Sequence, residues 1–285
     1  MINKFSIKNK NLKVEILRKG AQLSSVKGLD DFEYMWQGED VWQRHAPNLF
    51  PIVGSLIDHE YVLDDKTYSL KHHGFARDLE FDLLHQSEHS ACFVLQQSKK
   101  TFPSYPFKFT LLISFSLNQD NKLSQTFRVI NTGESEMPVS FGGHPAFNAN
   151  PVEDYVIDFD NSETGLASLL TGPYIGEEKV GVFKENSINL SKHTFDNDAL
   201  VFQSLNSKSA TLRNQKSKHQ VKVDFSEFPY LGIWAKPEAD FVCIEPWQGL
   251  ADFTKHNKDI RKKKGVVWLA PNQEISKTFH MEFSN

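Results

Sequence analysis

The most constraining feature of this sequence is an alternation of apolar and polar residues that recurs from one end to the other. In the segment LKVEILRK, Leu12, Val14 and Ile16 are separated by Lys13 and Glu15. A period of two places every second side chain on the same face of a β-strand, so one face of this strand is expected to pack on a core. No segment sustains a helical period over three turns. The sequence therefore predicts a chain built from strands.

Two segments predict pairs of strands joined by a reversal of the chain. EYVLDDKTYSL predicts two short strands that meet at Asp64–Asp65, because acidic residues are common where the backbone turns. FKFTLLISFSLNQDNKLSQTFRVINTG predicts two long strands separated by residues 118–121. Further strands are expected in ACFVLQQ, ATLRN, QVKVDFS, YLGIWAK, FVCIEPW and ISKTFHMEF. In residues 161–178, by contrast, Gly165, Gly172 and Pro173 favour a loop over a short helix.

The number of expected strands predicts an all-β protein of one domain. A sheet of this size must fold over on itself, so a large β-sandwich is the expected architecture. The 23 phenylalanines agree with this prediction, because flat rings pack well on a pleated face. The sequence contains no linker-like or low-complexity segment and no repeat period. Residues 1–285 are therefore expected to form a single domain.

Composition and charge narrow the classes of partner. The net charge is −4 and acidic and basic residues are interleaved, so neither nucleic acid nor a membrane is an expected partner. No signal-peptide core and no run of about 18 apolar residues is present. Cys92 and Cys243 are far apart, and we expect reduced structural thiols in a cytoplasmic protein. The basic segment 255–265 is expected to be a solvated loop, with a phosphate contact as the alternative.

The segment HHGFARDLEF contains a first group of candidate binding residues. Gly74 allows the backbone to approach a ligand closely, and His73 and Arg77 on either side of it could reach one pocket. Arg77 could equally form a surface ion pair with Asp78 or Glu80. His72 and His73 would point to opposite faces of a strand, so we expect no metal site here.

The segment SFGGHPAFNA places one histidine between two glycines and a proline. Pro145 restricts the backbone of His144 to extended geometry, which aims the imidazole in one direction. The ordinary pKa of a histidine, about 6.5, suits a proton donor near neutrality. His144 is therefore a candidate acid, and a histidine that only caps a turn is the alternative.

The segment FVCIEPWQG places the carboxylate of Glu245 directly after an apolar strand. Pro246 is expected to end this strand. Partial desolvation raises the pKa of a carboxyl group and makes Glu245 a candidate base, whereas a solvated strand end is the alternative. Trp247 offers an apolar face and Gln248 an amide that both donates and accepts, which suits a sugar.

Earlier in the sequence, Asp198 precedes an apolar strand, where it could accept a hydrogen bond from a sugar hydroxyl or close a turn.

Four motifs, in this order and at these intervals, resemble the aldose 1-epimerase (galactose mutarotase) family. They are NLFPIVGSL, HHGFARDLEF, GGHPAFN and FVCIEPWQG, and the chain is most similar to the shorter bacterial branch of lactose-operon-type epimerase-like proteins. The resemblance extends to WLAPNQEISKTFHMEF near the end. It implies a large antiparallel β-sandwich, the galactose mutarotase-like supersandwich, with a sugar site in a cleft on one face. It also implies an isomerase that interconverts the α and β anomers of an aldose without a metal or other cofactor.

The resemblance assigns a role to each matching residue. It implies that His144 is the catalytic acid, which protonates the ring oxygen, and that Glu245 is the catalytic base, which takes the proton of the anomeric hydroxyl. It further implies that His73, Arg77 and Asp198 bind the sugar. We expect a small-molecule sugar as the partner, and a monomer or a homodimer.

Two departures from the family pattern concern the identity of the sugar. Ser55 stands where relatives commonly have arginine, and Ala146 stands where they usually have tyrosine or tryptophan. The alternatives left open are a non-catalytic carbohydrate-binding or sugar-sensing protein on the same fold, and an epimerase acting on a hexose 6-phosphate. A glycoside hydrolase is a further rival, with Asp198 as the evident partner of Glu245.

Overall fold

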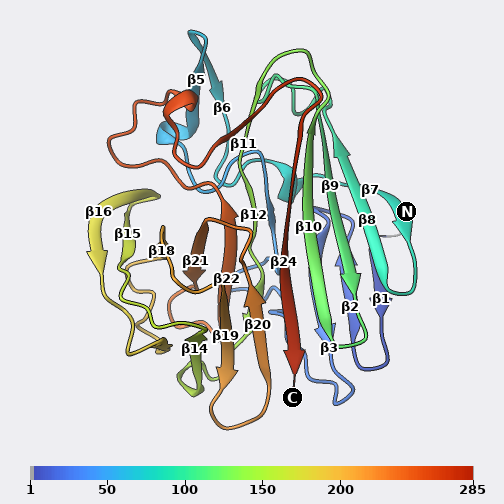
Figure 1. Ribbon diagram of the computed structural model, residues 1–285, viewed down its shortest axis with the longest axis vertical. Coiled ribbons are helices and arrows are strands. Elements are labelled where there is room, and N and C mark those ends of the chain that lie inside the picture. Colours follow the sequence, from blue (N-terminus) through green and yellow to red (C-terminus); the bar gives the residue numbers. More distant parts are fainter. Residues whose placement is uncertain (1–2, 285) are drawn as a thin grey trace.

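The computed structural model describes residues 3–284, and in this range the chain is almost entirely β-strand (Figure 1). It forms 24 strands, so the prediction of an all-β protein is confirmed. No helix in this range is long and apolar enough to cross a membrane. The helices are short 3-10 turns, namely η1 (Ile57–His59), η2 (Ala76–Asp78), η3 (Val152–Asp154) and η4 (Ile260–Lys262).

The larger of the two main sheets has nine antiparallel strands. Its β9–β10 hairpin is the one that the sequence predicts, with the reversal at residues 118–121. Alternate residues of β9 are buried, as the period of two requires. In spatial order the strands are β17 (Ser187–Asn189), β14 (Tyr155–Phe159), β19 (Ser209–Asn214), β20 (Gln220–Asp224), β24 (Glu274–Ser284), β10 (Lys122–Asn131), β9 (Phe109–Leu117), β8 (Ser90–Gln96) and β7 (Asp82–Gln86).

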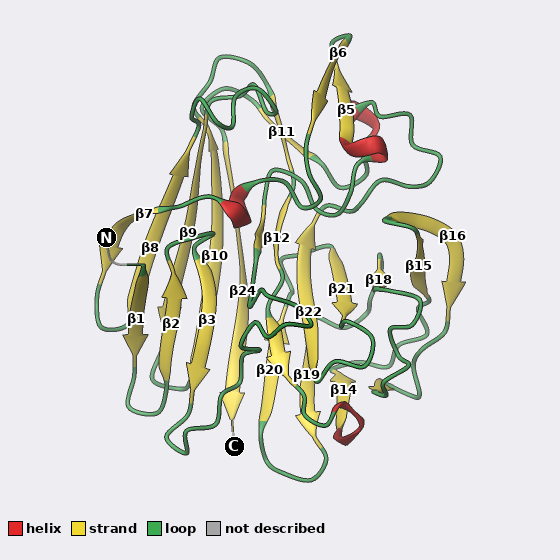
Figure 2. Ribbon diagram, turned by 180° about the vertical axis from the view of Figure 1, so that it is seen from behind, coloured by secondary structure: helices red, strands yellow, loops and turns green. Residues whose placement is uncertain are grey.

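The second main sheet has eight strands, and its β22 is buried along its whole length. Figure 2 shows β22 between β12 and β21. The ordered path is β16 (Tyr174–Val180), β15 (Ala167–Thr171), β18 (Leu200–Phe202), β21 (Tyr230–Trp234), β22 (Phe241–Gln248), β12 (Phe141–Gly143) and β4 (Asn48–Leu49), and β13 (Ala146–Asn148) also pairs with β22.

Three small sheets complete the fold. The β5–β6 hairpin projects at the top of Figure 1, and its turn at Asp64–Asp65 is the predicted one. The small sheets consist of β1 (Lys4–Lys8), β2 (Lys13–Leu17) and β3 (Gln22–Lys27), of β11 (Met137–Val139) and β23 (Val267–Leu269), and of β5 (Glu60–Leu63) and β6 (Lys66–Ser69).

Aromatic rings fill the space between the two main sheets. Phe127 of β10 stacks on Phe141 of β12 with ring centroids 5.6 Å apart, and both side chains are fully buried. Phe228 contacts both rings edge to face. The sheets therefore pack face to face as a sandwich, and the abundance of phenylalanine has the expected structural role.

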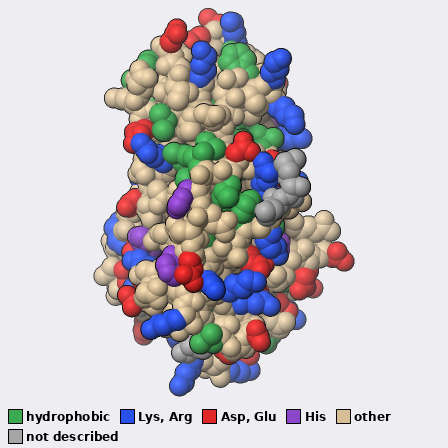
Figure 3. All heavy atoms as spheres, turned by 90° about the vertical axis from the view of Figure 1, so that its right-hand side faces the viewer, with side chains coloured by type: hydrophobic (Ala, Val, Ile, Leu, Met, Phe, Trp, Pro, Cys, Tyr) green, Lys and Arg blue, Asp and Glu red, His purple; other side chains and the backbone are tan. Residues whose placement is uncertain are grey.

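Charged side chains are dispersed over the surface. Figure 3 shows basic and acidic groups interspersed on the face at the β7 end of the nine-stranded sheet. This distribution agrees with their interleaving in the sequence.

Two predictions about connecting segments are wrong. Residues 161–178 contain β15 and most of β16, because Gly172 and Pro173 form a tight turn between two strands and do not mark an extended loop. The segment 255–265 is not simply solvated. Lys263 is buried and its Nζ lies 2.7 Å from Asp252 Oδ1, since a desolvated ammonium group requires a carboxylate partner.

The packing predicts a large effect for truncating the inter-sheet rings. Phe127→Ala is expected to lower the free energy of unfolding by about 3–5 kcal/mol, because a fully buried ring is replaced by a cavity. Urea denaturation followed by circular dichroism measures the change. Phe102 is 46% exposed, and Phe102→Ala is the control, with an expected change below about 0.5 kcal/mol. Equal effects of the two substitutions would contradict this account of the core.

Candidate active site

A cavity of about 520 Å³ lies on the face of the eight-stranded sheet that points away from the nine-stranded sheet. Side chains of β18, β21 and β22 form its floor, and the loops before β5 and after β6 contribute to its wall. Six predicted site residues line it, namely His73, Arg77, His144, Asp198, Glu245 and Trp247. The fold thus brings together residues that are far apart in the sequence.

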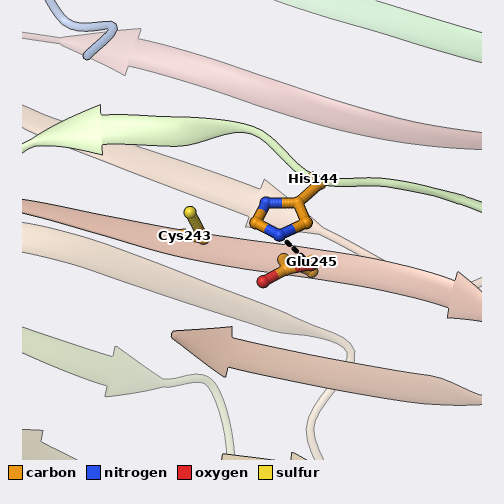
Figure 4. A group of neighbouring side chains, drawn as sticks. All are labelled: His144, Cys243 and Glu245. Carbon is orange, nitrogen blue, oxygen red and sulfur yellow. Dashed lines mark ion pairs between the residues drawn. The ribbon is translucent and has the colours of Figure 1, made fainter. Parts of the chain in front are cut away.

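The register of β22 places the two candidate catalytic residues opposite each other. Gly142 of β12 pairs with Trp247, and Ala146 of β13 pairs with Cys243 in the same register. His144 lies in the break between β12 and β13, so continuing this register sets it across from Glu245. Side chains directly opposite in an antiparallel pair share one face of the sheet. Figure 4 shows the imidazole of His144 facing the carboxyl group of Glu245.

The prediction that Pro246 ends the strand is wrong. β22 continues to Gln248, and Pro246 pairs with Leu231 of β21. On the other side of β22 the pairing stops at Trp247 and resumes at Cys243, so the missing N–H of Pro246 costs no ladder hydrogen bond there. The prediction that Gln248 contacts the sugar is also corrected. Strand alternation turns Gln248 to the face opposite Trp247, and its Nε2 donates to the carbonyl of Gly265 at 3.0 Å.

His144 and Glu245 form a close, buried pair. His144 Nε2 lies 3.2 Å from Glu245 Oε2, and the two side chains are 8% and 1% exposed. Burial lowers the pKa of His144 and raises the pKa of Glu245, since desolvation penalises both charged forms. A carboxyl group with a raised pKa is expected from the sequence, but its cause is full burial in the middle of a strand and not a position at the strand end.

Trp247 lies flat across the neighbouring strand. Its six-membered ring covers Gly232 of β21, and a Cβ atom at that position would overlap the ring. Trp247 Nε1 is buried and has no hydrogen-bond partner in residues 3–284. The site therefore offers an apolar face and an indole donor beside the carboxyl group of Glu245.

A tight turn after β6 presents His73 to the cavity as a hydrogen-bond donor. His73 and Gly74 both have positive φ angles, and the turn packs Gly74 against the backbone of Phe50, where a side chain would not fit. The N–H of Gly54 donates to His73 Nδ1 at 3.0 Å. Burial lowers the pKa of His73 well below its usual range, so the neutral ring holds its proton on Nε2.

His72 does not point away from His73 as a strand would require. The chain turns here, so both rings line the cavity, with centroids 3.8 Å apart. His72 Nδ1 shares a hydrogen bond of 2.8 Å with Ser55 Oγ, and burial lowers the pKa of His72 to about 4. Ser55, one of the two departures from the family pattern, is thus part of the wall.

Arg77 is a largely buried cation in the wall of the cavity, and it also forms a long ion pair with Asp78. Its Nη2 donates to the carbonyl of His72 at 2.7 Å, and the side chain is 15% exposed. Asp78 lies 3.9 Å from its Nε and is itself 3.0 Å from Arg44. Burial, together with Arg44, lowers the pKa of Arg77 to about 10, so it stays charged at neutral pH.

Asp198 combines both interpretations of its motif. It has a positive φ, and its Oδ1 accepts a hydrogen bond of 2.8 Å from the N–H of Ala199, so it does close a turn. It also lines the cavity, where its carboxylate can accept further hydrogen bonds.

Sequence reasoning missed two aromatic residues of the site. Trp42 and Trp234 line the cavity, and Trp234 pairs with Cys243 across β21 and β22. The period of YLGIWAK puts Trp234 on the same face as Gly232, a signal that could have identified it. Trp42 lies in an irregular segment, where the only signal in the sequence is a tryptophan in a mostly polar stretch.

Three side chains of the site have the donor atoms of a metal centre. Ligand atoms of His144, Cys243 and Glu245 lie within 4.8 Å of one another (Figure 4). A nitrogen, a sulfur and an oxygen ligand would suit a zinc-class ion. The wide spacing of the cysteines in the sequence does not indicate this cluster. The same positions of His144 and Glu245 also suit an acid–base pair without a metal.

Comparison with known proteins identifies the family. The family model described as aldose 1-epimerase matches residues 3–268. Protein LacX (plasmid) of Lactococcus lactis subsp. lactis is 31% identical over 98% of this chain and 99% of its own length. The chain belongs to the aldose 1-epimerase family, in the lactose-operon-type branch, and is an isomerase acting on carbohydrates.

Solved structures agree with this assignment. A galactose mutarotase related enzyme from Lactobacillus acidophilus superposes with a TM-score of 0.94 at 35% identity, covering 99% of this chain and 97% of that one. A galactose mutarotase-like protein from Lactobacillus casei gives 0.93 at 30% identity, covering 99% and 100%. The predicted galactose mutarotase-like sandwich is confirmed.

The buried histidines predict an acid-sensitive stability. The pKa of His73 is lowered in the folded state, so below about pH 6.5 the unfolded state binds a proton that the folded state does not. As the pH falls below this value, the free energy of unfolding is expected to decrease by up to about 1.4 kcal/mol per pH unit for this group. His73→Asn keeps an acceptor for the N–H of Gly54 and tolerates positive φ, and it should reduce this slope.

Urea denaturation at pH 5, 6 and 7 measures the slope. His85 is exposed on β7, and His85→Asn serves as the matched control with the wild-type slope. Identical slopes for His73→Asn and the wild type would rule out the neutral, buried state of His73.

Proposed function

We propose that this protein is an aldose 1-epimerase whose acid–base pair is His144 and Glu245. The observation that carries the proposal is the 3.2 Å approach of His144 Nε2 to Glu245 Oε2 on the floor of a cavity large enough for a hexose. Anomer exchange needs one group to remove a proton and another to deliver one on either side of the C1–O5 bond. These two side chains supply both groups.

The reaction proceeds by ring opening and closure. Glu245 takes the proton of the anomeric hydroxyl, and His144 delivers a proton to the ring oxygen as the C1–O5 bond breaks. The open-chain aldehyde then rotates about C1–C2. In the reverse steps His144 takes the proton from the hydroxyl on C5, the C1–O5 bond re-forms on the other face, and Glu245 returns its proton to the oxygen on C1. Each positioned group typically contributes on the order of 10²–10⁴-fold.

The burial of the pair favours this exchange of protons. Burial favours a neutral imidazole beside a neutral carboxyl group. Movement of the carboxyl proton across the short contact converts this form into an imidazolium and a carboxylate, the acid and the base that ring opening requires. The exchange leaves the net charge of the pair unchanged, so it needs no counter-ion.

Four further residues hold the sugar. His73 donates through Nε2–H, Arg77 donates through its guanidinium, and Asp198 accepts from hydroxyl groups. Trp247 covers an apolar C–H face of the ring, as aromatic side chains commonly do in ligand pockets. All four line the cavity.

We also propose that residues 1–285 act as a single domain, in the cytoplasm, as a monomer or a homodimer. One hydrophobic cluster contains buried side chains from both main sheets and from the β1–β3 sheet, which supports a single folding unit. The partner is a small-molecule sugar, consistent with the family.

Anomer equilibration tests the proposal directly. Polarimetry or NMR of freshly dissolved α-glucose, α-galactose and glucose 6-phosphate should show acceleration of at least one sugar by the wild type, and its loss in His144→Ala. The sugar that responds identifies the substrate class. Acceleration of none would assign the fold to a binding or sensing protein instead.

Glu245→Gln is expected to lower kcat by about 100-fold or more with little change in KM, because the amide keeps the shape of the side chain but cannot take a proton. The measurement is the initial rate of anomer exchange over a range of sugar concentrations. The exposed Glu136→Gln is the control and should match the wild type. An active Glu245→Gln enzyme would remove Glu245 from the role of base.

A further inference from the structure

The ring of His144 is fixed without the hydrogen bond that orients most catalytic histidines. In such residues the second ring nitrogen usually donates to a carboxylate or a backbone carbonyl, which sets the rotation of the ring. Here His144 Nδ1 is buried, and no other residue among 3–284 forms a hydrogen bond with it. The backbone of His144 is anchored, because its N–H donates to the carbonyl of Pro47 at 3.1 Å, but this contact leaves the ring free to turn.

Aromatic contacts surround the imidazole instead. The indole of Trp42 stacks on His144 with centroids 5.2 Å apart and an interplanar angle of 25°. Trp234 and His73 meet the imidazole nearly edge to face, at 5.8 Å and 82° and at 5.6 Å and 87°. Rotation of the imidazole would drive it into the stacked indole, so Trp42 restricts the plane of the ring.

Trp42 is itself held firmly enough to act as a support. Its ring stacks on Phe241 at 5.3 Å and 19° and contacts Trp234 at 5.5 Å and 68°. Its backbone carbonyl accepts a hydrogen bond of 2.9 Å from Trp36 Nε1. Phe241 is fully buried at the start of β22, so the support is connected to the strand that carries Glu245.

We propose that Trp42 is the positioning residue of His144, holding the imidazole by stacking in the plane in which Nε2 faces Glu245 and the reacting ring oxygen. This inference rests on the proposed acid role of His144. Trp42 also lines the cavity, so the competing role is direct contact with the sugar. The two roles differ in what they change, because positioning acts on kcat through His144 and sugar contact acts on KM.

Trp42→Leu keeps an apolar side chain but removes the flat face. We expect kcat to fall on the order of 10- to 100-fold, with KM within about twofold of the wild type, because a small misplacement of a reacting group has effects of this size. Trp42→Phe should restore most of the rate, since a phenyl ring can stack in the same place. Trp268→Leu is the matched control, because Trp268 lies on β23 beside Arg261 and outside the cavity.

A double-mutant cycle separates the two roles. If Trp42 acts through His144, Trp42→Leu should produce no further loss in a His144→Ala background. A loss by the same factor in both backgrounds, or a rise in KM with kcat unchanged, would overturn the proposal in favour of sugar contact. A wild type without epimerase activity, or a His144→Ala variant as fast as the wild type, would instead refute the proposed function.

NMR tests the positioning without reference to activity. The ring protons of His144 should be shifted upfield by the indole face in the wild type, and this shift should disappear in Trp42→Leu and persist in Trp268→Leu. Unchanged His144 ring resonances in Trp42→Leu would contradict the proposal even if the rate fell. Circular dichroism establishes that each variant is folded.

Discussion

The geometry of the site depends on one interruption in the hydrogen bonding of β22. β12 and β13 pair with this strand in a single register, and between them the chain leaves the ladder at residues 144–145. The interruption allows Pro246 to occupy a central strand, and it sets His144 across from Glu245. Glu245 is thereby held by a fully buried strand, and His144 by the short connection between two strands that pair with it. A site built on strands in this way is more rigid than one carried by loops alone.

The cavity concentrates polar groups that the fold itself leaves unsatisfied. Residues 3–284 contain six buried side-chain atoms without a hydrogen-bond partner, and four of them belong to residues lining this cavity. These four are Arg77 Nε, His144 Nδ1, Trp247 Nε1 and Glu245 Oε2, whose 3.2 Å contact with His144 Nε2 is an ion-pair contact and not a hydrogen bond. Folded proteins satisfy nearly all buried polar atoms, so such a concentration in one place is the mark of a ligand that supplies the missing bonds. By contrast, the buried Lys263 has its carboxylate partner and acts as structure.

Much of this organisation follows from the sequence, and the remainder does not for identifiable reasons. Periodicity and turn residues identify the strands and the hairpins, and motif order identifies His144 and Glu245. The sequence predicts that the strand ends at Pro246, so it does not show that β22 continues and that alternation turns Gln248 away from Trp247. The sequence also does not show which irregular segment folds over a sheet. Trp42 lies in such a segment, so its place in the site cannot be predicted. The sequence does not distinguish the turn at Gly172–Pro173 from a longer loop, because glycine and proline are common in both.

The burial of the acid–base pair suits a reaction in which net charge does not change. Ring opening removes one proton from the sugar and returns another, and its product is a neutral aldehyde. A buried pair that exchanges a single proton follows this course without creating an isolated charge, which a desolvated site would strongly disfavour. His72 and His73 remain neutral for the same reason, as burial lowers the pKa of both. Among the residues lining the wall, Arg77 keeps its charge, and it can therefore orient a hydroxyl-bearing ligand without competing for the transferred proton.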